Sequence, residues 1–147
     1  MKNKTAPDFT IKTVDDNEFT LDEHRGEVIL LNFFATQCYG CRCVLYQLKK
    51  LSDDIKNSVT VVAVDVWFFS HDETLDNLLQ FKEEMEGEWL FGMDSYQTFV
   101  TEKYYEKSQL GINLPLTFLI DREGRISYSK EGCVPKQVLV EEIGKLL

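Results

Sequence analysis

The sequence lacks any apolar run close to the roughly 20 residues that a membrane-spanning helix needs. Its N-terminus, MKNKTAPDFT, is basic but is not followed by the apolar region of a signal peptide. We therefore expect either a cytoplasmic protein or an extracytoplasmic one whose export segment has been removed.

Positive charge is also scarce. The 147 residues include 16 Lys and Arg against 25 Asp and Glu, a net charge of −9, and the basic residues form no stripe. Such a surface repels a phosphate backbone, so nucleic acid is excluded as a partner. The chain has no internal repeat and no low-complexity segment. At this length, with 44% hydrophobic residues, it is expected to fold as one domain over residues 1–147 and to be a monomer.

Cysteine is rare but concentrated. Three of the four cysteines fall within six residues, a pattern too sparse and too clustered for a scaffold held by disulfides. These three are Cys38, Cys41 and Cys43. Structural zinc usually takes four ligands, commonly from two separated pairs, and the sequence has no second Cys-x-x-Cys pair. The fourth ligand would have to be Cys133, His24 or His71. A metal site and a group of inert buried thiols are therefore the less favoured alternatives to redox chemistry, and both histidines are more simply loop or cap residues.

Hydrophobic patterns predict alternating strands and helices. Residues 9–13 and 18–20 alternate between apolar and polar side chains, which predicts a β-hairpin. Residues 28–35 (VILLNFFA) carry apolar side chains at both odd and even positions, which indicates a central strand covered on both faces. From Cys41 onward, one helical face carries apolar side chains at Leu45, Leu48, Leu51 and Ile55. Residues 59–69 (VTVVAVDVWFF) predict a second buried strand, with Trp67, Phe68 and Phe69 packing at its end.

The second half of the chain continues the alternation. Ser70 and Glu73 have the spacing of a capping box, which predicts a helix through Leu75, Leu78, Leu79 and Met85. We expect a short strand over 88–93 containing a core Trp89, a helix from Asp94 or Ser95 to about Lys107, a turn over 111–115, and strands over 116–121 and 125–130. Pro135 fits the first turn of a closing helix that ends at Leu147. The alternation predicts an α/β fold with a late antiparallel hairpin.

The predicted strand–helix junction carries the chemistry. Cys38 follows the strand, and Cys41 lies one turn later on the same side of the helix. Unpaired N–H groups at a helix N-terminus favour an anion, and in such Cys-x-x-Cys settings a thiol pKa of about 8.5 can fall to about 3.5–7.5. Cys38, exposed at the tip, is expected to be the nucleophile, and Cys41 to resolve the mixed disulfide. A loop of four residues is a poor staple, which favours redox chemistry over stabilisation.

The chain resembles the thioredoxin-fold thiol–disulfide oxidoreductases of the TlpA/ResA branch, relatives of the AhpC/TSA redoxins. The likeness covers almost the whole chain and includes the APDF segment at 6–9, the RGEVILLNFF segment at 25–34, the CYGC motif at 38–41 and the LPLTFLID segment at 114–121. It implies a mixed sheet flanked by helices, with an N-terminal hairpin and a helix–strand insertion at about 70–110.

The resemblance also implies roles for particular residues. Pro115 is expected to be cis and to face the two cysteines, and Leu114 with Pro115 to bind an extended client peptide by backbone contacts. Tyr39 and Gly40, between the cysteines, are expected to contact the client and to help set the redox potential.

Several positions depart from the family pattern. Gln37 stands where members usually carry Trp before the first cysteine. Asn32 stands where thioredoxin has a buried Asp, and Val44 where ResA-like members often have Glu, so an acidic side chain from elsewhere or a water would have to accept the proton of Cys41. Cys43 projects about 200° around the helix from Cys41 and is expected to be a small buried or half-buried residue. The same holds for Cys133; a Cys43–Cys133 disulfide, or one with a partner, is the alternative.

These observations predict a reductant of protein disulfides that uses no cofactor beyond the redox-active Cys38–Cys41 disulfide. Its expected partners are a disulfide-bearing client and a dithiol electron donor, either thioredoxin-like or membrane-embedded. One alternative is an AhpC/TSA-type peroxidase, but Ala35 occupies the position of the Thr that such enzymes place three residues before the cysteine, and no Pro precedes it. A non-enzymatic redox sensor or metal-binding thiol module is the other alternative.

Overall fold

A mixed sheet of seven strands forms the centre of the computed structural model, which describes residues 3–95, 97–108 and 113–147. Its strand order is β2-β1-β5-β4-β3-β6-β7. The strands are β1 (Thr10–Thr13), β2 (Glu18–Thr20), β3 (Val28–Phe34), β4 (Val59–Asp65), β5 (Leu90–Met93), β6 (Leu116–Ile120) and β7 (Ile126–Glu131). Strands β3, β4 and β5 are parallel, whereas β1–β2, β1–β5, β3–β6 and β6–β7 are antiparallel.

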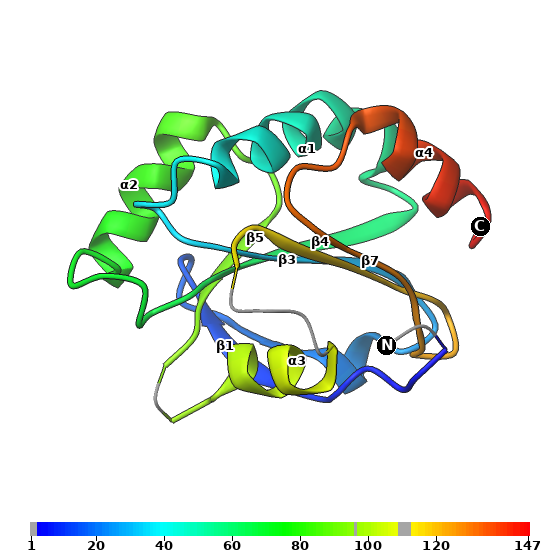
Figure 1. Cartoon of the computed structure of the whole chain (residues 1–147), viewed down its shortest axis with the longest axis horizontal. Coiled ribbons are helices and arrows are strands. Elements are labelled where there is room, and N and C mark those ends of the chain that lie inside the picture. The colour runs from blue at the N-terminus through cyan, green and yellow to red at the C-terminus, as the bar shows by residue number, and fades with distance from the viewer. Residues whose placement is uncertain (1–2, 96, 109–112) are drawn as a thin grey trace.

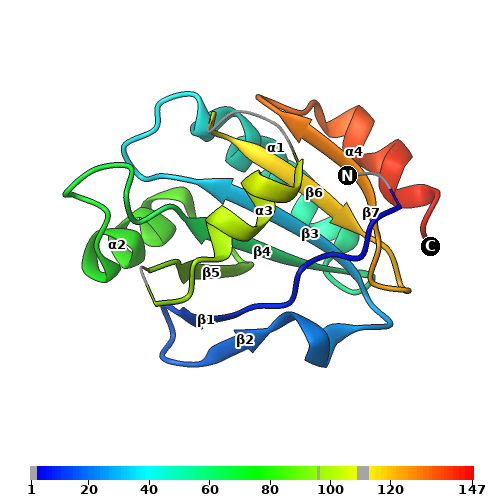
Figure 2. The same cartoon turned by 60° about the horizontal axis from the view of Figure 1, so that its bottom comes forward.

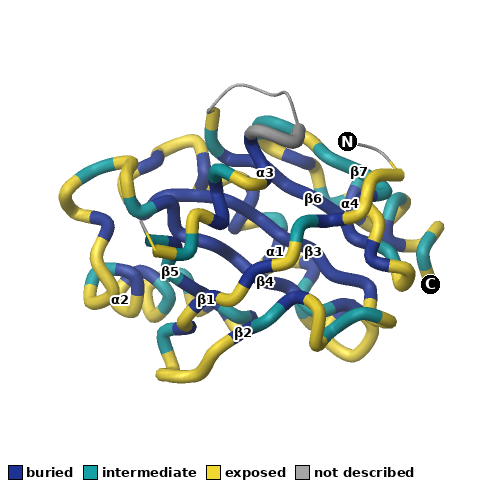
Figure 3. Tube along the Cα trace, turned by 90° about the horizontal axis from the view of Figure 1, so that it is seen from below, coloured by how far each residue is buried: buried dark blue, intermediate teal, exposed yellow. Residues whose placement is uncertain are grey.

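Helices cover both faces of the sheet (Figures 1 and 2). On one face lie α1 (Cys41–Ile55), α2 (Leu75–Met85) and α4 (Lys136–Gly144); the other is covered by α3 (Val100–Ser108) and the N-terminal segment. A short 3-10 helix, Leu21–His24, joins β2 to β3. Because both faces are covered, every residue of β3 is buried, as its apolar run predicts, and Figure 3 shows the central strands as the buried part of the trace.

Most predicted elements are present. The hairpin, the central strand, α1 with its buried Leu45, Leu48, Leu51 and Ile55, and the late hairpin all form as expected. The insertion at about 70–110 consists of α2, β5 and α3, and Trp89 is buried in the core as predicted. The predicted turn at 111–115 lies outside the described residues except for its last three positions.

Several predicted boundaries are wrong, and β5 starts at Leu90 rather than at residue 88. Strand β4 ends at Asp65 rather than at residue 69, and the chain then turns, with the N–H of Phe69 donating to the carbonyl of Val66 at 3.1 Å. The cap of α2 is Thr74, whose hydroxyl accepts from the N–H of Asn77. Ser70 and Glu73 do not cap α2; instead the Glu73 carboxylate accepts hydrogen bonds from the backbone N–H of Thr36 and from the Ser70 hydroxyl.

Helix α3 starts at Val100 because of a long-range cap. Both carboxylate oxygens of Asp94 are used: Oδ1 accepts from the N–H of Val100 at 2.9 Å and Oδ2 from that of Thr101 at 2.8 Å. These contacts satisfy N–H groups that a helix start leaves without intrahelical partners. Residues 97–98 form a turn rather than the first turn of the helix. Helix α4 ends at Gly144, three residues before the predicted Leu147.

Candidate active site

Cys38 and Cys41 are joined by a disulfide at the junction between β3 and α1, with their Cα atoms 5.4 Å apart. The N–H of Cys38 donates to the carbonyl of Ala35 at 3.1 Å, and the N–H of Cys41 donates to the carbonyl of Cys38 at 3.2 Å. Cys38 is 9% exposed and Cys41 is 1% exposed. Cys38 is thus the more accessible of the two, as expected, but it is far less exposed than the prediction of a cysteine at the tip implied.

The electrostatics of this junction favour a thiolate. Helix α1 begins at Cys41 with Gly40 at its N-cap, and its first turn contains no acidic residue. No carboxylate of the helix's own first turn therefore neutralises the N-terminal end of the helix dipole, which stabilises negative charge on nearby sulfur.

Pro115 lies beside the dithiol segment, and the Leu114–Pro115 peptide bond is cis, as expected from the resemblance. Strand β6 runs antiparallel to β3 with Leu116 paired to Phe33, so Pro115 lies next to the end of β3 from which the dithiol loop departs. Leu114 is half-buried and packs against the hydrophobic cluster that contains both cysteines. The two segments predicted to form the site therefore meet in space.

Exposed side chains lie next to the dithiol in sequence and on the loop that follows the neighbouring strand. Tyr39 is 90% exposed, and its neighbours Gln37 and Gly40 are also exposed. Phe68 and Phe69, predicted to pack at a strand end, are instead 39% and 46% exposed because β4 stops before them. Since β3 and β4 are parallel neighbours, the segments that follow them emerge at the same edge of the sheet, and Figures 1 and 2 both place residues 35–40 and 66–74 at one end of the molecule.

Two of the positions that depart from the family pattern, Asn32 and Val44, are buried, whereas the third, Gln37, is exposed. Asn32 is 0% exposed, and its Nδ2 donates to Thr117 Oγ1 at 3.0 Å and to the Leu116 carbonyl at 3.5 Å. Val44 is also fully buried. Asn32 therefore ties β3 to β6 beneath the dithiol and offers no titrating group.

Cys43 and Cys133 form a second disulfide with their Cα atoms 5.7 Å apart. Both residues are exposed, so the expectation that each is a small buried or half-buried thiol is wrong and the alternative pairing is right. Cys43 projects to the outer side of the first turn of α1, where the segment before α4 passes. The bond joins positions 90 residues apart, so one disulfide does act as a staple despite the clustered pattern.

A buried pair of carboxyl groups lies behind the dithiol loop, and the sequence analysis did not identify it as part of the site. Glu73 accepts a hydrogen bond from the backbone N–H of Thr36 at 2.5 Å, and Asp65 ends β4 directly beside Phe34. Burial, a hydrogen bond with Glu73 and the negative charge of Glu73 raise the pKa of Asp65 to about 10. A carboxyl group within the apolar run VTVVAVDVWFF was the available signal, because buried acids are rarely without a partner.

The remaining candidates lie elsewhere. His24 stacks on Phe19 and pairs with Glu27 through Nδ1 at 3.0 Å, whereas His71 is exposed before α2. Within residues 3–95, 97–108 and 113–147, no group of three or more Cys, His, Asp or Glu side chains is arranged to hold a metal ion. No helix in the described part of the chain is long and apolar enough to cross a membrane.

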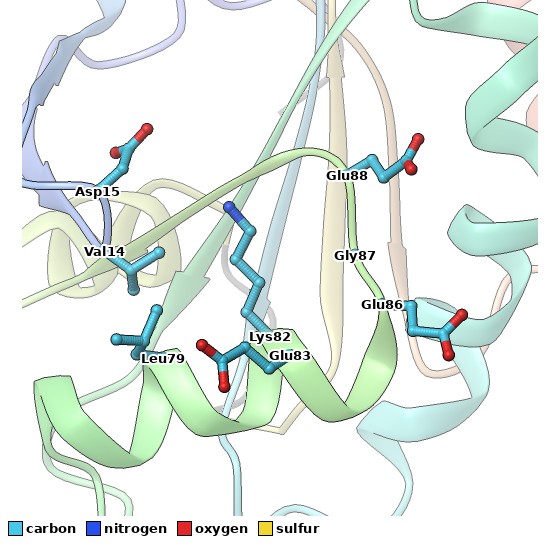
Figure 4. A pocket seen from close by; sticks show the side chains of 8 residues that line it. All are labelled: Val14, Asp15, Leu79, Lys82, Glu83, Glu86, Gly87 and Glu88. Atoms are coloured by element: carbon cyan, nitrogen blue, oxygen red, sulfur yellow. The ribbon is translucent and has the colours of Figure 1, made fainter.

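An open pocket between α2 and the β1–β2 turn is a poor candidate site (Figure 4). It contains one cation, Lys82, whose amine points between Asp15 and Glu88, and no cysteine lines it. Its other lining residues are Val14, Leu79, Glu83, Glu86 and Gly87. Thiol chemistry therefore belongs to the junction where β3 ends and α1 begins, and not to this pocket.

Comparisons with known proteins agree with this geometry. The redoxin family model matches residues 1–147. Thioredoxin-like protein YneN of Bacillus subtilis is 24% identical over 97% of this chain and 78% of the relative. Thiol-disulfide oxidoreductase ResA of Geobacillus thermodenitrificans is 27% identical over 95% of this chain and 74% of the relative. A crystal structure of a thiol:disulfide interchange protein from Chlorobium tepidum superposes with a TM-score of 0.83, at 21% identity, over 99% of this chain and 97% of that one. The fold is thus the thioredoxin fold.

Proposed function

Because the chain belongs to the redoxin family, we propose that it is a thiol–disulfide oxidoreductase that reduces disulfides of client proteins through Cys38 and Cys41. The observation that carries the proposal is the Cys38–Cys41 disulfide at the start of α1, beside the Leu114–Pro115 segment. The relatives named as thiol-disulfide oxidoreductases support the same activity.

The reaction proceeds by two exchanges. The Cys38 thiolate attacks one sulfur of the client disulfide, the client S–S bond breaks, and the departing client thiolate takes up a proton. The Cys41 thiolate then attacks the Cys38 sulfur and releases the second client thiol. The two electrons given to the client leave the Cys38–Cys41 pair as a disulfide, which is the form that the structure shows. A dithiol protein donor returns two electrons and completes the cycle.

The client binds across the rim of the dithiol. Its extended backbone lies along Leu114 and Pro115, as a strand added to an edge would. Tyr39 and the exposed Phe68 and Phe69 contact apolar client side chains and replace the aromatic residue that Gln37 does not supply. A donor of the thioredoxin-like or membrane-embedded class would approach the same exposed rim.

Substitution of each cysteine tests the proposal. Reduction of insulin under dithiothreitol is expected to be lost in Cys38→Ser, and Cys41→Ser is expected to accumulate a mixed disulfide through Cys38. The double variant Cys43→Ser/Cys133→Ser serves as the control and retains activity. Adducts of Cys41→Ser that are linked only through Cys43 would show that the nucleophile is wrongly assigned. The same Cys41→Ser protein, used as a trap in cells, identifies the client and the compartment.

A further inference from the structure

Glu73 is held in the protein interior directly behind the dithiol loop. It is 7% exposed, and Thr36, its main partner, is 6% exposed. Oε1 of Glu73 accepts from the Thr36 backbone N–H at 2.5 Å, and the Thr36 hydroxyl lies 2.9 Å from Oε1 and 3.0 Å from Oε2. The Ser70 hydroxyl donates to Oε2 at 3.2 Å. These four contacts fix both oxygens of the carboxylate.

Asp65 completes the arrangement from the neighbouring strand. It is fully buried and pairs with Phe34 across parallel strands, so both side chains point to the face that α1 covers, where the two cysteines also pack. The raised pKa keeps the Asp65 carboxyl protonated at neutral pH. Both Asp65 oxygens are buried and receive no hydrogen bond from the described residues, so the protonated acid has Glu73 as the acceptor for its proton. The donors from Thr36 and Ser70 all point to Glu73, which places the negative charge of the pair on Glu73.

This charge is connected to the nucleophile through a short stretch of backbone. Thr36 lies two residues before Cys38, and the intervening turn is closed by the hydrogen bond from the Cys38 N–H to the Ala35 carbonyl. Holding Thr36 therefore orients the turn that presents the Cys38 sulfur. The fixed Glu73 carboxylate also disfavours a second negative charge on the Cys38 sulfur, whereas the N-terminus of α1 favours that charge.

We propose that Glu73 is a positioning residue for the dithiol: it anchors the loop through Thr36, and its charge limits the fraction of Cys38 present as thiolate. Asp65 serves as its buried, neutral hydrogen-bond donor. The inference rests on the proposed function and assigns to Glu73 the control of how readily the dithiol reacts at a given pH.

Other charged or titratable groups surround the loop and must stay constant in the test. They are Arg42 of α1, His71 and Asp72 before α2, and Glu84 of α2. Arg42 lies over the Phe81 ring, with Cζ 5.2 Å from its centroid. Because these groups remain in every variant below, a difference between variants reports on the Asp65–Glu73 pair.

The test measures alkylation of Cys38 by iodoacetamide in the fully reduced protein as a function of pH, with the modified residue mapped by mass spectrometry. Glu73→Gln keeps the side-chain shape but removes the charge. It is expected to lower the pH midpoint of Cys38 alkylation by about one unit, which is about a tenfold gain in rate below the midpoint. Asp65→Asn is the matched control: it replaces a neutral donor with a neutral donor, and its midpoint is expected to stay within a few tenths of a unit of the wild type.

Two results would overturn the inference. Equal midpoints in Glu73→Gln and the wild type mean that the charge does not reach Cys38. A shift in Asp65→Asn without one in Glu73→Gln means that the charge lies on Asp65. A purely structural role of Glu73 would lower the melting temperature of Glu73→Gln and leave its alkylation midpoint unchanged.

A second measurement needs no variant. Carboxyl carbon NMR of reduced wild-type protein is expected to show the Glu73 resonance moving over the same pH range in which Cys38 ionises, because coupling between two sites is reciprocal. A Glu73 resonance that ignores this range contradicts the proposal even if Glu73→Gln does not fold. The alkylation midpoint does not depend on turnover, so loss of insulin reduction with a normal midpoint shift would refute the proposed function alone.

Discussion

Cys43 and Cys133 link the first turn of α1 to the segment that precedes α4. The preceding residue, Gly132, donates its N–H to the carbonyl of Pro115 at 2.8 Å. Through the adjacent Gly132 and its hydrogen bond to Pro115, the second disulfide is therefore connected to the segment proposed to bind the client. The helix that carries Cys41 and the Leu114–Pro115 segment are held together at this point.

Removal of this disulfide is expected to destabilise the protein without abolishing its chemistry. A crosslink that closes a loop of this length typically contributes about 2–4 kcal/mol, and about 1 kcal/mol corresponds to about 2–4 °C in a chain of this size. Cys43→Ser/Cys133→Ser should therefore melt several degrees below the oxidised wild type. Calorimetry measures the difference in melting temperature. Under full reduction neither protein has the crosslink, so the two melting temperatures should then be equal. An unchanged melting temperature in the oxidised comparison would contradict the assigned role.

Asp65→Asn is expected to stabilise the protein at neutral and alkaline pH. In the unfolded chain Asp65 loses its proton near its ordinary pKa of 3.8, whereas the folded protein retains that proton up to about pH 10. The wild type therefore binds more protons when folded, and its free energy of unfolding falls as the pH rises from about 4 toward 10. The Asn variant lacks this dependence and should gain on the order of a few kcal/mol at pH 7. Urea denaturation at several pH values measures both curves, and parallel curves would refute the assignment.

Asn32→Asp is expected to cost stability and to introduce a new titration into turnover. The new carboxyl oxygen would face the Leu116 carbonyl, which Asn32 Nδ2 now approaches at 3.5 Å, so the acid is favoured in its protonated form. As it ionises with rising pH, the pH profile of insulin reduction should shift toward that of thioredoxin. Asn32→Leu, which cannot titrate, is the control for lost hydrogen bonding. A profile that is identical for the Asp and Leu variants would mean that this position does not sense Cys41.

Phe68→Ser/Phe69→Ser is expected to weaken the binding of protein clients and to leave the reduction of small disulfides unchanged. The two rings are exposed at the edge from which the dithiol loop emerges, so their loss removes apolar contact area without changing the thiols. The KM for insulin in the reduction assay should rise several-fold, whereas the rate of reduction of a small aromatic disulfide should stay unchanged. Leu147→Ser, a matched change to an exposed apolar residue on the distant C-terminus, should alter neither.

Local sequence patterns predicted those elements whose hydrophobic signal is local. The apolar run of β3 and the 3.6-residue period of α1 each describe one segment that must be buried, and both formed as expected. The dithiol and Pro115 were also identified from their motifs. Their meeting follows from the antiparallel pairing of β3 and β6, which a motif order characteristic of the family implies.

Features that depend on contacts between distant residues were not predictable in the same way. The Ser70–Glu73 spacing fits a capping box, but the Glu73 carboxylate instead accepts a hydrogen bond from the backbone N–H of Thr36, 37 residues away in sequence. Asp94 likewise moved the start of α3 by satisfying backbone donors six and seven residues later. In each case a carboxylate bonds to the group that the tertiary fold brings nearest, and local spacing contains no information about that group.

The pairing of all four cysteines sets the stoichiometry of any reductive titration. A fully oxidised chain accepts four electrons, yet one catalytic turnover delivers two. A donor that discriminates between the two bonds will produce a half-reduced species that is catalytically competent, whereas a strong chemical reductant will carry the protein past it. Preparations that differ only in exposure to reductant can therefore share the same activity and still differ in heat resistance.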